Sequence, residues 1–244
     1  MIIWKWLSHI MLVRHGCYCT VDGLALKGAT VNMRITEQEQ EIRRKRMLYA
    51  AYELFCERGI HDVSMADIAK AANVSPNSIF RYFDSKLSLL RQTQGLLWEE
   101  IVNCITNHNK EALLNVKSGL EEMRVLLYGF ENLYQNHSGY LLFAYQYKGY
   151  LLQNKIKMSQ EEYGETYCKV THYFLNSLNH GQADGSITTE YPSEILFTFI
   201  WNMMRHFVEQ LVVHNRVYEG ENPWESMFPL LVNQIITNLD SKKK

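Results

Sequence analysis

Apolar residues recur at intervals of three and four along the chain from Thr36 onward, which is the spacing of amphipathic helices. The strict alternation of apolar and polar residues that marks a strand is not evident. Four prolines occur in the 244 residues, and none lies between Pro76 and Pro192, so long helices can run without interruption. The pattern predicts an all-α protein of about nine helices.

The first predicted helix begins at Thr36, which can form a capping box with Glu39, and ends near Gly59. Residues 1–32 show no clear period, whereas the well-patterned sequence starts just after Met33. We therefore expect residues 1–32 to be a non-native or disordered extension, such as an over-long gene start produces. An ordered N-terminal arm is the alternative.

Two short helices separated by a tight turn come next. Ser64 can cap the first of them, and Asn73 can adopt the left-handed conformation that the turn needs. Ser75 and Pro76 then supply an N-cap and a first helical residue with a pre-set φ angle. Six further helices are predicted at about 86–108, 118–136, 139–153, 159–180, 192–214 and 223–240. Pro229 is expected to kink or restart the last of them.

Composition allows a large core but gives no global sign of a polyanion partner. Hydrophobic residues make up 47% of the chain, and its net charge is -1. Residues 34–91 contain ten Lys or Arg and eight Asp or Glu, which gives a net charge of +2. Residues 92–244 contain twelve Lys or Arg and seventeen Asp or Glu, which gives a net charge of -5. Any basic surface must therefore be local.

The five cysteines indicate neither a disulfide framework nor a zinc site, because their number is odd and only Cys17 and Cys19 lie close together. No apolar run reaches the roughly 18 residues that a membrane-spanning helix requires. We expect a cytoplasmic protein with no membrane contact and no bound metal.

The short helices on either side of Asn73 predict a helix-turn-helix over residues 64–83, in which the second helix enters the major groove of double-stranded DNA. Ile79 and Phe83 lie on one face of that helix. The opposite face presents polar side chains, namely Asn77, Ser78, Arg81 and Tyr82. A purely structural helical hairpin is the alternative.

Ordered positions in this region carry a family resemblance. They are Gly59-Ile60, Val63-Ser64-Met65, Ile68-Ala69, Ala72-Asn73-Val74-Ser75, Ile79-Phe80-Arg81-Tyr82-Phe83 and Ser85-Lys86. Over this stretch the sequence resembles the TetR family of regulators. A weaker match is the segment 181–187 before Pro192, which looks like a loop in that family's C-terminal domain. The resemblance implies a helix-turn-helix DNA-binding domain at 33–84 and a ligand-binding and dimerisation domain at 85–244.

The resemblance also implies a homodimer whose recognition helices each read half of a roughly palindromic operator. By position, the candidate groove contacts are Ser75, Asn77, Ser78, Arg81 and Tyr82, and the candidate phosphate contacts are Ser64 and Lys86. Two departures matter. Asn73 stands where the family usually has Gly, and Phe80 occupies a DNA-facing position where the family usually has Tyr, so Phe80 cannot donate a hydroxyl hydrogen bond to phosphate.

The basic run at residues 43–46 covers more than one helical turn, so its charges point in several directions. Arg43 and Arg44 are its candidate DNA contacts. A solvated face balanced by the neighbouring glutamates is the alternative.

The C-terminal part is rich in aromatic residues, and five polar groups among them are candidate ligand contacts: Tyr128, Tyr145, His172, Asn202 and His206. A core or dimer role is the alternative for an apolar stripe that contains Phe199 and Met203. The last two helices, at 192–215 and 223–239, resemble the family's dimerisation pair. Their expected interface includes Leu230 or Leu231 with Ile235 and Leu239.

No glycine-rich phosphate loop, HExxH motif, nucleophile elbow or CxxC pair occurs, so we expect neither an enzyme nor a cofactor. The expected function is that of a homodimeric transcriptional repressor released from its operator by a small, largely apolar ligand. The alternative is a helical interaction or ligand-sequestering protein of the same fold that no longer binds DNA, an alternative that Asn73 and Phe80 favour.

Overall fold

The computed structural model describes the backbone of residues 31–106, 110–222 and 225–243. Side chains are described for these ranges except residues 31–36, 110, 160–169 and 243. The predicted extension, residues 1–32, lies almost wholly outside the described residues. Within them the all-α prediction is confirmed, since the chain forms helices and a single isolated bridge between Ile187 and Asp240.

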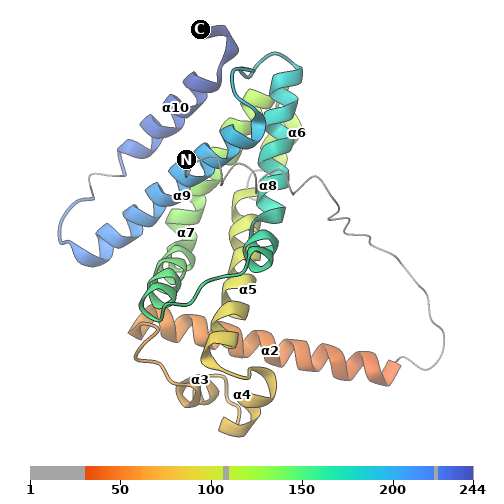
Figure 1. The fold of residues 1–244 in the computed structure, drawn as a ribbon, viewed down its shortest axis with the longest axis vertical. Helices are drawn as coiled ribbons and strands as arrows, with labels where there is room; N and C mark the ends of the chain where they lie inside the picture. The colour runs from red at the N-terminus through yellow and green to blue at the C-terminus, as the bar shows by residue number, and fades with distance from the viewer. Residues whose placement is uncertain (1–30, 107–109, 223–224, 244) are drawn as a thin grey trace. The chain divides into compact units, whose positions relative to one another are not determined.

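Nine α-helices and a short 3-10 helix, η2, make up the described part of the chain (Figure 1). They are α2 (Val31–Arg58), α3 (Met65–Ala71), α4 (Pro76–Tyr82), α5 (Lys86–Thr106), α6 (Lys110–Asn115), α7 (Gly119–Gln153), α8 (Gln160–Ala183), α9 (Ser193–Val217), α10 (Met227–Leu239) and η2 (Ser241–Lys243). The chain divides into two compact units, Met1–Arg43 and Arg44–Lys244. The described side chains of the first unit, residues 37–43, are exposed.

Two helix starts follow the predicted capping residues, Ser64 and Ser75, and Ser118 caps a third helix in the same way. The hydroxyl oxygens of Ser64, Ser75 and Ser118 each accept a backbone N–H from the first turn of α3, α4 and α7. The start of α2 differs, because the helix is already formed at Val31 and runs through Thr36. The predicted capping box with Glu39 is therefore wrong as a helix boundary.

Helix α7 replaces two predicted helices. The break expected between residues 136 and 139 is present as a kink at His137, where φ is -137° and ψ is 29°, but the helix resumes at once without a loop. Helix α6 has no counterpart among the predicted helices.

Two clusters of buried side chains fill the second unit. One joins α2, α3 and α4 to the first half of α5, and it includes Phe143, Tyr147 and Leu151 from the second half of α7. The other joins the second half of α5 to α8, α9, α10 and the first part of α7. Helices α5 and α7 therefore contribute to both cores and connect the helix-turn-helix to the C-terminal helices.

Helix α10 packs onto this second core with one face. Ile235 and Leu239 are 4% and 3% exposed within the single chain. The expectation that they belong to a dimer interface is wrong, because their side chains already fill the core of their own chain. Leu230, which is 56% exposed, remains on the outer face.

Candidate functional site

Helix α3 is fixed at its start by a reciprocal pair of hydrogen bonds. The Ser64 N–H donates to Asp67 Oδ2 at 2.8 Å, and the Asp67 N–H donates to Ser64 Oγ at 3.1 Å. These hydrogen bonds from Ser64 hold the pKa of the Asp67 carboxyl below its usual value. The Ser64 hydroxyl also donates to Asp67 Oδ2 at 2.6 Å, so a phosphate would have to replace that acceptor.

The turn after α3 depends on Asn73, whose φ of 54° lies in the left-handed region. In this conformation the Asn73 N–H donates to Lys70 O at 3.1 Å and the Val74 N–H donates to Ala69 O at 2.9 Å. These bonds satisfy the last carbonyls of α3. Asn73 thus adopts the left-handed conformation at a position where glycine is usual in the family that this segment resembles.

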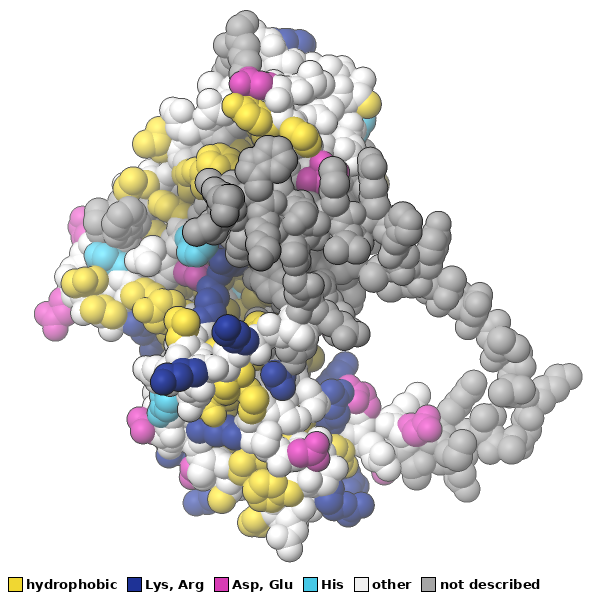
Figure 2. Space-filling model, in the orientation of Figure 1, with side chains coloured by type: hydrophobic (Ala, Val, Ile, Leu, Met, Phe, Trp, Pro, Cys, Tyr) yellow, Lys and Arg dark blue, Asp and Glu magenta, His cyan; other side chains and the backbone are white. Residues whose placement is uncertain are grey.

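Helix α4 has the two faces that the sequence predicts. Ile79 and Phe83 are fully buried, and they anchor the helix to the core of the helix-turn-helix. Asn77, Phe80 and Arg81 are exposed on the other side. Figure 2 shows Lys and Arg side chains distributed around the end of the molecule that carries α3 and α4.

Three of the predicted groove contacts, the N-cap residue of α4 and two residues within the helix, are partly engaged within the protein. Ser75 Oγ and Ser78 Oγ lie 2.7 Å apart in a hydrogen bond, and Ser75 Oγ also accepts the Ser78 N–H at 3.2 Å. The half-buried Tyr82 ring lies 6.4 Å from the ring of Phe83. Asn77 and Arg81 are therefore the polar residues of α4 whose side chains are most open to a partner.

Lys86 is placed differently from a surface lysine. Its ammonium group donates a hydrogen bond to the carbonyl oxygen of Ile60 and lies 5.9 Å from the centre of the Phe55 ring. Partial burial lowers the pKa of Lys86, against the opposing effect of Asp62 and Asp67. Lys86 therefore holds the segment before α3 against α5. This structural role is separate from the contact with DNA phosphate that the sequence predicts for it.

The two candidate arginines of α2 have different surroundings. Arg44 donates from Nε and from one terminal guanidinium nitrogen to Gln92 Oε1 of α5, at 2.9 and 2.6 Å. This interaction ties α2 to α5 in a way that the sequence did not indicate. Arg43 belongs to the first unit, where its side chain is exposed.

The five predicted ligand contacts line neither of the two hollows found among the described residues. Tyr145, His172 and His206 are exposed, and the half-buried ring of Tyr128 packs 6.2 Å from that of Phe228. Asn202 Nδ2 donates to its own helix at Thr198 O, 2.7 Å away. Of the five, Asn202 and His206 are brought together, because His206 Nδ1 lies 2.7 Å from Asn202 O.

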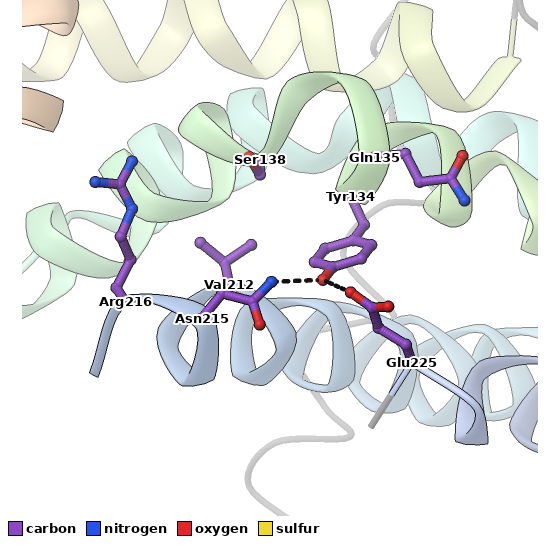
Figure 3. Close-up of a pocket in the computed structure, with 7 residues that line it drawn as sticks. All are labelled: Tyr134, Gln135, Ser138, Val212, Asn215, Arg216 and Glu225. Carbon is purple, nitrogen blue, oxygen red and sulfur yellow. Dashed lines mark hydrogen bonds between the residues drawn. The ribbon is translucent and has the colours of Figure 1, made fainter. Parts of the chain in front are cut away.

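A groove that the sequence did not indicate lies between α7 and the end of α9, with a volume of about 310 Å³ (Figure 3). Helix α7 contributes Tyr134, Gln135 and Ser138 on both sides of the kink. Val212, Asn215 and Arg216 come from α9, and Glu225 closes one end. Polar side chains separated by about 80 residues form this groove, so no local motif marks it.

Neither a membrane span nor a metal cluster is found among the described residues. None of their helices is both long and apolar enough to cross a membrane. No group of three His, Cys, Asp or Glu side chains in the same ranges is placed to hold a metal ion.

A capped short helix, a tight turn and a second helix with an exposed polar face define a helix-turn-helix protein. Residues 47–93 match the family model of the bacterial regulatory proteins, tetR family. The HTH-type transcriptional regulator BetI of Escherichia coli O45:K1 is 34% identical over 90 residues, which cover 35% of this chain and 42% of BetI. The match thus spans less than half the length of that relative. The helix-turn-helix segment of the chain is thus similar to that of the tetR family of bacterial regulatory proteins.

Solved structures agree over most of the chain. The fatty acid degradation regulator FadR from Bacillus halodurans aligns with a TM-score of 0.62 and 16% identity over 87% of this chain and 97% of FadR. FadR from Bacillus subtilis, solved in complex with stearoyl-CoA, aligns with a TM-score of 0.58 and 16% identity over 80% of this chain and 98% of FadR. At these identities the similarity shows a shared two-domain helical fold.

Proposed function

We propose that this protein is a sequence-specific DNA-binding repressor that acts as a homodimer and inserts helix α4 into the major groove. The observation that supports the proposal most strongly is the two-faced character of α4. Ile79 and Phe83 are fully buried, while Asn77 and Arg81 are exposed at the surface of a helix too short to be stable alone. A surface helix held this firmly can present side chains to base edges without losing much conformational entropy.

Within that proposal, Asn77 and Arg81 read base edges, supported by Ser78 and Tyr82. Arg and Asn side chains form bidentate hydrogen bonds with guanine and adenine, respectively. Contacts with the phosphate backbone and the groove edge position the helix without specifying sequence. We assign these contacts to Ser64, Ser75, Lys86, Arg43 and Arg44.

Dimerisation is proposed to use the outer faces of α9 and α10. Large apolar side chains are exposed on both helices, among them Phe199 (59%), Leu230 (56%), Met227 (41%) and Ile195 (37%). Exposed apolar side chains that gather on a helix pair are a common sign of a protein interface. Two such pairs form a four-helix bundle across a twofold axis, which sets the spacing of the two α4 helices.

The proposed effector is a small, largely apolar molecule bound among the aromatic residues of the C-terminal helices. The rings of Phe130, Phe174 and Trp201 lie 5.4 to 6.3 Å apart and form the centre of that core. The FadR structure with stearoyl-CoA shows that a protein of this fold can hold a ligand with a long apolar chain. Of the five predicted polar contacts, the half-buried Tyr128 and Asn202 remain candidates for such a ligand, whereas Tyr145, His172 and His206 are exposed.

An electrophoretic shift with DNA from around the protein's own gene tests the proposal. Wild-type protein is expected to shift one fragment in the presence of excess unrelated DNA, and Arg81→Ala is expected to lose that selectivity. Lys157→Ala, a substitution far along the chain from α4, is the matched control for a lost positive charge. Equal binding of specific and unrelated DNA by the wild-type protein would support the helical interaction or ligand-sequestering alternative.

A further inference from the structure

The groove between the α7 kink and the end of α9 is lined mainly by polar and charged side chains. One of its walls is α7 on either side of His137, the residue whose backbone leaves helical geometry. Its volume of about 310 Å³ is enough for a small organic molecule. A second hollow of about 110 Å³ continues it and shares Tyr134, Gln135 and Glu225.

A chain of hydrogen bonds fixes one end of the groove. The Tyr134 hydroxyl donates to Glu225 Oε1 at 2.6 Å and accepts from Asn215 Nδ2 at 2.8 Å (Figure 3). Asn222 Nδ2 in turn donates to Asn215 Oδ1 at 2.6 Å. Burial and the hydrogen bond with Glu225 raise the pKa of Tyr134, so this hydroxyl stays a neutral donor. The Glu225 carboxylate is therefore held in place while its second oxygen stays available.

The other end of the groove carries the opposite charge. Figure 3 shows Arg216 at the far side of the groove from Glu225, with Ser138 and Val212 between them. Within the described ranges, no carboxylate forms an ion pair with the Arg216 guanidinium, and no cation forms one with Glu225. The groove thus has a guanidinium group at one end and a carboxylate at the other. Neither group forms an ion pair with another described residue, and the width of the groove separates them.

We propose that this groove binds a small zwitterion, whose carboxylate pairs with Arg216 and whose ammonium group pairs with Glu225. Guanidinium and carboxylate form charge-assisted, bidentate hydrogen bonds, and an ammonium group donates to the second oxygen of Glu225. The methylene groups between the two charges lie over Val212. Ser138 and Gln135 supply further polar contacts. The site is separate from the aromatic core proposed for the apolar effector, and it does not depend on DNA binding.

Calorimetric titration of the full chain in the absence of DNA tests the site. The probes are the ω-amino acids γ-aminobutyrate and ε-aminocaproate, which differ in the distance between their charges. Caproate and hexylamine each keep one charge of ε-aminocaproate. At least one ω-amino acid is expected to bind about tenfold more tightly than either single-charge probe.

Substitutions within the groove identify where the probe binds. Arg216→Gln and Glu225→Gln remove one charge each from exposed positions, and each is expected to weaken binding by about tenfold or more. Arg124→Gln, which removes an exposed arginine of α7 that donates to Asn233 Oδ1 at 3.1 Å, is the control that should bind normally. Circular dichroism checks that each variant is folded.

Three results would overturn the proposal. The first is the absence of saturable binding of both ω-amino acids up to about 10 mM. The second is binding of caproate as tight as that of the ω-amino acids, which indicates a site for anions only. The third is unchanged binding of the ω-amino acids in both groove variants. Loss of DNA binding by the protein bears on the regulator proposal alone, since no DNA is present in this titration.

Discussion

Tyr52 of α2 lies so close to Gly139 of α7 that a Cβ atom on residue 139 would be 2.2 Å from the tyrosine hydroxyl oxygen. The Cys56 thiol donates to Gly139 O at 3.4 Å, and the Tyr52 ring packs 5.5 Å from Tyr140. Burial raises the pKa of Cys56 to about 11, despite the opposing effects of Tyr52 and Arg216. This contact joins the core of the helix-turn-helix to the kinked part of α7.

Gly139→Ala is expected to destabilise the protein by about 1–3 kcal/mol, because Tyr52 must leave its packed position to admit the methyl group. Gly149→Ala on the same helix is the matched control. A Cβ there meets no atom within 4 Å, so alanine should leave stability unchanged or raise it by up to about 1 kcal/mol. Urea unfolding followed by circular dichroism measures both. Equal effects of the two substitutions would show that the Tyr52 contact is not tight.

Substitutions at Asn73 test the turn of the helix-turn-helix. Asn73→Ala is expected to cost about 1 kcal/mol, because alanine tolerates the left-handed conformation less well than asparagine. Asn73→Gly should be neutral or slightly stabilising at the same φ angle. Thermal unfolding compares the three proteins. A loss of stability in Asn73→Gly as large as that in Asn73→Ala would point to a role of the Asn73 side chain instead of its backbone.

Glu209 holds together a charged cluster between α7 and α9. Its carboxylate, 7% exposed, accepts from Lys148 Nζ at 2.6 and 2.8 Å and from a terminal guanidinium nitrogen of Arg205 at 2.8 Å. Burial lowers the pKa of Lys148, against the opposing effect of Glu209. Two cations therefore depend on a single buried anion.

Glu209→Gln is expected to cost about 3–5 kcal/mol, because it leaves two partly buried cations without a counter-charge. Lys148→Gln should cost much less, since Arg205 still neutralises Glu209 and Lys148 is 42% exposed. Urea unfolding gives the free energy of unfolding of both variants and shows which substitution destabilises the protein more. A larger loss in Lys148→Gln would contradict the central role given to Glu209.

Phe80→Tyr is expected to strengthen DNA binding. Phe80 is 53% exposed on α4, and the added hydroxyl can donate to a phosphate oxygen. One such hydrogen bond is worth about 0.5–1.5 kcal/mol, or roughly two- to tenfold in affinity. Fluorescence anisotropy with labelled operator DNA measures the change, and Phe80→Leu serves as a control without a hydroxyl. Identical affinities of the tyrosine and phenylalanine proteins would place residue 80 away from the backbone.

Local sequence signals predicted α3, the turn and α4 well, since the features that define them are close in the chain. Ser64 with Asp67 forms a cap within one helical turn, and Asn73 sits between two short periodic segments. The buried positions of Ile79 and Phe83 follow from spacing alone. The continuity of α7 through His137 was not predictable in this way, because packing on both sides holds the helix together across the break.

Contacts between distant residues escaped prediction for the same reason. Lys86 has the sequence position of a phosphate contact, but its bond to Ile60 depends on how α5 folds back against the segment before α3. Ile235 and Leu239 have the spacing of an interface, and only the packed structure shows that they face their own core. The groove residues Tyr134, Arg216 and Glu225 share no local pattern.

Selection of bound sequences from a pool of random double-stranded DNA tests the central claim most directly, because every possible operator sequence competes in the same pool. The wild-type protein is expected to enrich an inverted repeat with two half-sites about one helical turn apart, bound by two protein chains. The same selection with Arg81→Ala is expected to lose base preference at a matching position in each half-site. Enrichment of no sequence by the wild-type protein, or of the same motif by Arg81→Ala, would contradict DNA reading by α4.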